Sequence, residues 1–155
     1  MLSANLVSRL VEACQGSGVG GLTVVSELVR HCPELEFIYL GDTARVPYGT
    51  KSSEVVQAYS RKITRLLVEE GASSILIACN TASAHALEHL KMEFSLPIEG
   101  VIVPGAQRAA ELSSTGHIGV IGTQGTILSQ SYVHAIKSLR PEAQIYAQPC
   151  PLFVP

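Results

Sequence analysis

The sequence predicts an α/β fold, a mostly parallel sheet with helices on both faces. Hydrophobic residues make up 46% of the 155 residues and charged residues only 15%, so much of the chain must be buried. Aromatic residues reach only 5%, which suits helices covering a parallel sheet better than an aromatic-rich sandwich. Short apolar runs alternate with segments of helical periodicity, which indicates right-handed crossovers between parallel strands.

Five apolar runs, each flanked by Gly, Pro or polar residues, are expected to be buried strands: 37–40, 74–79, 98–103, 118–121 and 144–147. Helical spacing predicts helices over 22–29, over 55–67 behind a Ser52 or Ser53 cap, over 84–94, and over 127–139 ending before Pro141. Residues 6–15 also have helical spacing, so we expect no clear strand before residue 16. We divide the chain into a first α/β lobe, residues 1–97 with 1–15 atypical, and a partial second lobe, residues 98–155.

Charge and composition exclude several classes of protein. The formal net charge of −2 and a pI near 6.2 provide no field that would attract nucleic acid. The apolar runs fall short of the roughly 20 residues needed to span a bilayer, and the N-terminus has no secretion-signal pattern. The four cysteines form no C-x-x-C pair, which fits reduced thiols rather than a zinc site or a disulfide framework. We therefore expect a cytoplasmic protein with no membrane partner.

The strongest chemical signal lies where the predicted strand 74–79 ends in a cysteine. Asn80 or Thr81 can cap the following helix, which would put the Cys79 sulfur at a helix N-terminus. That position favours a thiolate, so Cys79 can act as a base or a nucleophile. The alternative is a small buried hydrophobic residue, a common role for free cysteine. The amide of Asn80 and the hydroxyls of Thr81 and Ser83 favour ligand binding, because a carboxylate needs donors.

Three other segments have weaker signals. Residues 41–51 combine charged groups, a phenol and two glycines, which predicts either a solvated loop or a wall of a polar pocket beside Cys79. Residues 16–21 match G-x-G-x-x-G, but without a clear preceding strand we favour a turn that permits close backbone approach over a nucleotide site. His85 and His89 match H-x-x-E-H, yet no third ligand is identifiable, so we favour an exposed helix face over zinc.

Taken together, six ordered blocks resemble the bacterial glutamate racemase family: GSGVGGLTV (16–24), YLGDTARVPYGTK (39–51), ACNTAS (78–83), GVIVPGA (100–106), GVIGTQGT (119–126) and CPLFVP (150–155). The resemblance runs from about Gly16 to Pro155, whereas residues 1–15 do not match. It implies the Asp/Glu racemase superfamily, with two α/β lobes around a cleft. It also implies interconversion of L- and D-glutamate for peptidoglycan synthesis, with glutamate as the small-molecule substrate and with neither cofactor nor metal.

In that family two cysteines face opposite sides of the substrate α-carbon, and one removes a proton while the other returns one. The resemblance implies that Cys79 is the first of these cysteines. It implies substrate contacts for five further residues, whose backbone and side-chain donors suit charged amino-acid groups: Ser17, Tyr48, Gly49, Asn80 and Thr81.

The chain departs from the family pattern in ways that affect activity. Gly16 stands where the family has an aspartate that assists the first cysteine. The chain stops at Pro155, before the family's second cysteine motif, and Cys150 is not that residue. We therefore expect a truncated racemase with slow or no racemisation.

Two alternatives and the oligomeric state remain open at this point. The chain can be a non-catalytic remnant or an amino-acid-binding protein. Acyl transfer by Cys79 is a second enzymatic alternative, although no His or Asp stands at a readable partner position. The oligomeric state is also open, a homodimer included.

Overall fold

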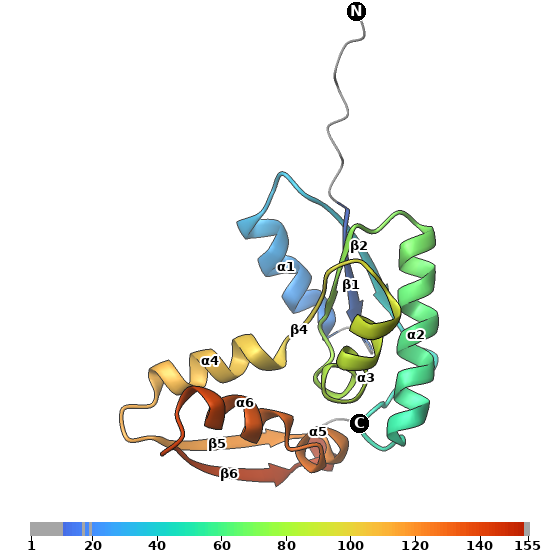
Figure 1. The fold of residues 1–155 in the computed structure, drawn as a ribbon. Coiled ribbons are helices and arrows are strands. Elements are labelled where there is room, and N and C mark those ends of the chain that lie inside the picture. Colours follow the sequence, from blue (N-terminus) through green and yellow to red (C-terminus); the bar gives the residue numbers. More distant parts are fainter. Residues whose placement is uncertain (1–10, 17, 19, 154–155) are drawn as a thin grey trace, which may run out of the picture.

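The computed structural model describes residues 11–16, 18 and 20–153, which form two parallel sheets (Figure 1). The first sheet has the order β2-β1-β3-β4 and contains β1 (Val11–Gly16), β2 (Glu36–Gly41), β3 (Ser74–Ile77) and β4 (Ile98–Gly100). The second pairs β5 (His117–Gly122) with β6 (Gln144–Pro149). All neighbouring strands are parallel, so the carboxyl ends of each sheet's strands meet at one edge.

Helices cover both sheets and confirm the predicted α/β fold class. They are α1 (Gly21–His31), α2 (Ser53–Glu69), α3 (Asn80–Glu93), α4 (Ile102–Leu112), α5 (Gln124–Leu128) and α6 (Ser131–Leu139), followed by the 3-10 turn η1 (Pro151–Phe153). In Figure 1, α1 and α2 flank the first sheet, and α4 and α6 lie over the second. No helix in these described ranges is long and apolar enough to cross a membrane.

Each sheet has its own buried core. The first core joins α2 and α3 to the sheet through fully buried side chains that include Leu67, Ile77 and Leu90. The second is smaller and consists of Ala106, Ile118, Ile136 and Ala143. The division into lobes at residue 97 stays a prediction, and β4 pairs with β3, so the change from one sheet to the other lies after residue 100.

The expectation that residues 6–15 are helical is wrong for the part that the structure describes. Residues 11–16 form β1, which lies between β2 and β3 and pairs with both. This strand adds a sixth to the five that were expected. A short apolar run fits a helix or a strand equally well, and here pairing on both sides decides in favour of the strand.

Two boundaries in the second half also differ from the prediction. The expected strand 98–103 ends at Gly100, and Ile102 begins α4, which includes Pro104. Proline is tolerated in a first helical turn because its missing N–H needs no partner there. The single helix expected over 127–139 is interrupted at Gln130, whose left-handed φ of 56° separates α5 from α6.

Two buried hydroxyls on α2 lead to a stability prediction. Ser60 and Thr64 are fully buried, and within the described part of the chain neither side-chain oxygen has a hydrogen-bond partner. Ser60→Ala is expected to raise the free energy of unfolding by about 1 kcal/mol, because it removes an unpaired buried polar group. Urea unfolding measures this change. Ser138→Ala, at an exposed position of α6, controls for helix propensity, and an equal gain in both variants would contradict the prediction.

Candidate active site

The carboxyl edge of the first sheet opens into a cavity of about 840 Å³. Its walls come from the glycine-rich segment after β1, the loop after β2 and the start of α3, and from Thr123 and Tyr132 of the second half. The volume lies in the range of small-molecule sites, and carboxyl edges of parallel sheets commonly hold ligands.

Cys79 lies at the wall of this cavity, directly before α3. It is the N-cap residue, and its sulfur accepts a hydrogen bond from the Ala82 amide at 3.5 Å. The expected cap residue was Asn80 or Thr81, but these are instead the first two helical residues. Cys79 packs against the first core but is only partly buried, and it lines the cavity, so it is not a fully enclosed core residue.

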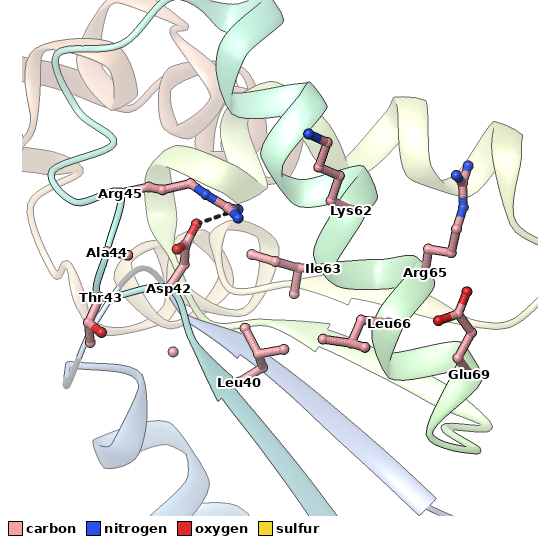
Figure 2. Close-up of a pocket in the computed structure, with 11 residues that line it drawn as sticks. Leu40, Asp42, Thr43, Ala44, Arg45, Lys62, Ile63, Arg65, Leu66 and Glu69 are labelled. Atoms are coloured by element: carbon pink, nitrogen blue, oxygen red, sulfur yellow. Dashed lines mark hydrogen bonds and ion pairs between the residues drawn. The ribbon is translucent and has the colours of Figure 1, made fainter.

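Tyr48 is held by a buried carboxylate that the motif analysis did not single out. Its side chain is only 2% exposed, and its hydroxyl donates to Asp42 Oδ2 at 2.5 Å. Arg45 Nη1 lies 3.2 Å from the same oxygen, and its guanidinium lies over the Tyr59 ring at 5.0 Å. Figure 2 shows this Arg45–Asp42 pair at one end of a second cavity of about 460 Å³ beside α2. The loop 41–51 is therefore fixed by side-chain contacts at the cavity wall.

The buried phenol of Tyr48 leads to a pH prediction. Burial, and next the hydrogen bond to Asp42, raise the pKa of Tyr48 well above its ordinary value of 10.0. As pH rises above 10, the unfolded chain loses this proton while the folded chain keeps it. Below pH 10 the stabilisation from the raised pKa of Tyr48 is fully present. Above pH 10 this one group is expected to lower the free energy of unfolding by about 1.4 kcal/mol per pH unit.

Urea unfolding of the wild type and Tyr48→Phe between about pH 8 and pH 11 measures this slope. Tyr132, whose pKa is also raised by burial, contributes to both proteins and cancels in the comparison. Equal slopes above pH 10 would show that Tyr48 does not titrate as expected.

The second half of the chain closes the cavity through contacts with Gly49 and Thr81. The Gly125 amide donates to the Gly49 carbonyl at 3.0 Å. A Cβ atom at Gly49 would overlap the Thr123 side chain, with Thr123 Cγ2 only 2.6 Å away. The Thr81 hydroxyl lies 2.9 Å from that of Thr123 and 3.2 Å from that of Thr126. These contacts join α3 to α5 and make one site from two sheets.

Ser83 and His85 serve structural contacts rather than the roles considered for them. Ser83 is buried, and its hydroxyl donates to the Ile77 carbonyl at 2.9 Å and accepts from the Val101 amide at 3.3 Å. His85 Nε2 lies 3.1 Å from the Gly125 carbonyl oxygen. Throughout the described ranges, no three His, Cys, Asp or Glu side chains are grouped to hold a metal ion.

A family model described as Asp/Glu/Hydantoin racemase matches residues 3–150. The chain belongs to this racemase family. The resemblance seen in the six sequence blocks is thus confirmed, and the match begins earlier than the expected start at residue 16.

Relatives and solved structures agree with this membership. The chain is 54% identical to a glutamate racemase of Geobacter metallireducens and 50% identical to one of Aquifex aeolicus, in each case over 90% of this chain; the match covers 52% and 54% of those proteins. The chain therefore spans about half the length of the curated relatives it matches.

Two solved structures have a similar fold. The Aquifex pyrophilus glutamate racemase has a TM-score of 0.88 at 43% identity, covering 92% of this chain and 56% of that one. The Francisella tularensis glutamate racemase, solved in complex with D-glutamate, has a TM-score of 0.85 at 36% identity, covering 94% of this chain and 54% of that one.

The first motif of this racemase-family chain differs from the implied pattern at Gly16. Gly16 is buried, and a Cβ atom there would lie 2.5 Å from the Tyr39 hydroxyl oxygen, which itself donates to the Gly18 carbonyl. An aspartate at position 16 would therefore require Tyr39 to move. Ser17, an expected substrate contact, lies outside the described residues.

Of the other expected contacts, the structure brings Tyr48, Gly49, Asn80 and Thr81 together with Cys79 around one cavity. Their roles toward a substrate stay predictions. Thr123 and Tyr132 are among the cavity residues that were not named as site residues. Thr123 had a signal, because it follows a predicted strand within a sequence block of the resemblance. Tyr132 had none, because it lies inside a helix.

Proposed function

We propose that this chain forms the glutamate pocket of a glutamate racemase and contributes one of its two proton-carrying cysteines. The observation that supports this most is the position of Cys79 at the N-terminus of α3, in the wall of the cavity that Tyr48, Gly49, Asn80 and Thr81 also line. The substrate follows from the relatives, which are glutamate racemases, and from the Francisella tularensis enzyme in complex with D-glutamate.

The proposed chemistry uses Cys79 as the base. Its thiolate removes the α-proton from one face of bound glutamate, and the N-terminus of α3 stabilises the anionic sulfur. Donors at Asn80 and Thr81 hold the charged groups of the substrate and offset the negative charge that develops at the α-carbon. Inversion also needs an acid on the opposite face, and among the described residues that line the cavity Cys79 is the only cysteine.

We further propose that the protein works in the cytoplasm, where D-glutamate supplies peptidoglycan synthesis, as the family resemblance implies. We also propose that the chain divides into two lobes, residues 1–97 and 98–155, and that it assembles as a homodimer. Size-exclusion chromatography with light scattering tests the assembly.

The test of the function is incubation of the chain with L- or D-glutamate in D2O. We expect deuterium to be incorporated at the α-carbon, which proton NMR detects. We expect slow or no optical inversion, which polarimetry detects. Rapid inversion would refute the proposal that the chain supplies a proton carrier on only one face of the substrate. Thermal stabilisation by glutamate without any exchange would favour an amino-acid-binding protein instead. If glutamate causes no stabilisation and no exchange occurs, the proposed function is refuted.

A further inference from the structure

Asn80 has a side chain with two chemically different ends, and only one of them suits an anionic ligand. Its amide nitrogen donates hydrogen bonds, whereas its oxygen only accepts them. Asn80 lines the cavity directly after Cys79. A carboxylate in the cavity is attracted by the NH2 group and repelled by Oδ1. The affinity of the site for amino acids therefore depends on which end faces the cavity.

Tyr132 holds the oxygen end. Its hydroxyl donates to Asn80 Oδ1 at 2.8 Å, across a separation of 52 residues in the chain. The hydroxyl stays protonated at neutral pH, since burial raises the pKa of Tyr132 above its ordinary value of 10.0. With Oδ1 occupied, the NH2 group of Asn80 is left for the ligand.

The position of Tyr132 is set by the second sheet and its helices, independently of Asn80. The ring packs against the second core, which contains Ala106 of α4 and Ile136 of α6. A Cβ atom at Gly105 would lie 3.0 Å from the Tyr132 oxygen and 3.2 Å from a ring carbon, so the glycine makes room for the ring. Tyr132 is thus an anchored donor that reaches from α6 to α3.

We propose that Tyr132 is a positioning residue that fixes the Asn80 side chain with its NH2 group toward the cavity, so that the second half of the chain orients a substrate contact of the first. The identity of the ligand rests on the glutamate racemase function proposed above. The orientation of Asn80 does not, and it can be tested without any ligand.

The first experiment compares the wild type with Tyr132→Phe, which keeps the ring and removes the hydroxyl. The Asn80 side-chain NH2 resonance is assigned in a ¹H–¹⁵N spectrum by its loss in Asn80→Ala. We expect it to shift and to gain fast mobility in Tyr132→Phe, measured by ¹⁵N relaxation. Tyr146→Phe, on exposed β6, is the matched control and should leave the resonance unchanged. An Asn80 resonance unaffected by Tyr132→Phe would overturn the proposal.

The second experiment measures the affinity for L-glutamate by calorimetry in a double-mutant cycle. Tyr132→Phe is expected to weaken binding about fivefold in the wild type and less than about twofold in the Asn80→Ala background, because its effect passes through Asn80. Equal losses in both backgrounds would overturn the proposal, since a merely structural role does not depend on Asn80. If the wild type binds no glutamate, the proposed function fails, and the NMR comparison alone decides the role of Tyr132.

Discussion

Replacing Cys79 with serine is expected to lower the rate of deuterium uptake at the glutamate α-carbon by about 10²–10⁴-fold, the usual contribution of a positioned base. A serine hydroxyl is too weak an acid to provide an anionic base near neutral pH. Serine is also a preferred N-cap residue, so it can replace the hydrogen bond that the Cys79 sulfur accepts from the Ala82 amide. The variant thus removes the chemistry while it preserves the start of α3.

The measurement is α-proton exchange in D2O followed by NMR, with circular dichroism to verify the fold. Cys150→Ser is the matched control, since Cys150 follows β6 and does not line the cavity. It should retain the wild-type rate. Exchange that persists in Cys79→Ser would assign the base to another group, and loss of exchange in Cys150→Ser would implicate a second thiol.

Replacing Gly49 with alanine is expected to destabilise the protein by about 1–3 kcal/mol, the range for overpacking a close contact. The added Cβ atom would overlap the Thr123 side chain, and backbone movement would disturb the hydrogen bond from the Gly125 amide to the Gly49 carbonyl. Since Gly49 and Thr123 both line the cavity, the affinity for glutamate is expected to fall as well. Urea unfolding and calorimetry measure the two effects.

The control is Gly119→Ala, where nothing lies within 4 Å of the added Cβ atom, so the change should be within about 0.5 kcal/mol. Thr123→Gly removes the clashing side chain at the cost of the α5 cap. The double variant with Gly49→Ala should therefore be more stable than the sum of the single effects predicts. Strict additivity would show that Thr123 is not the obstacle.

Local signals explain what could be predicted from the sequence. Ser52 caps α2 as expected, its hydroxyl accepting from the Val55 amide at 3.5 Å, because a cap requires only residues three positions apart. Cys79 could be predicted between a strand and a helix for the same reason, although β3 ends at Ile77, two residues before the expected strand end at Cys79. By contrast, β1 was missed because its identity depends on β2 and β3, which pair with it from distant parts of the chain.

The sequence by itself determined the α/β class, the racemase family and the position of Cys79 directly before a helix. Only the tertiary structure decided that Asp42 holds Tyr48, that Gly49 must stay small beside Thr123, and that Tyr132 reaches Asn80. The physical reason is the range of the interactions. Caps and periodicity act within a few residues of one another, whereas these contacts, apart from that of Asp42 with Tyr48, arise where two separately packed sheets meet. Even Asp42 and Tyr48 meet only because their loop folds back on itself.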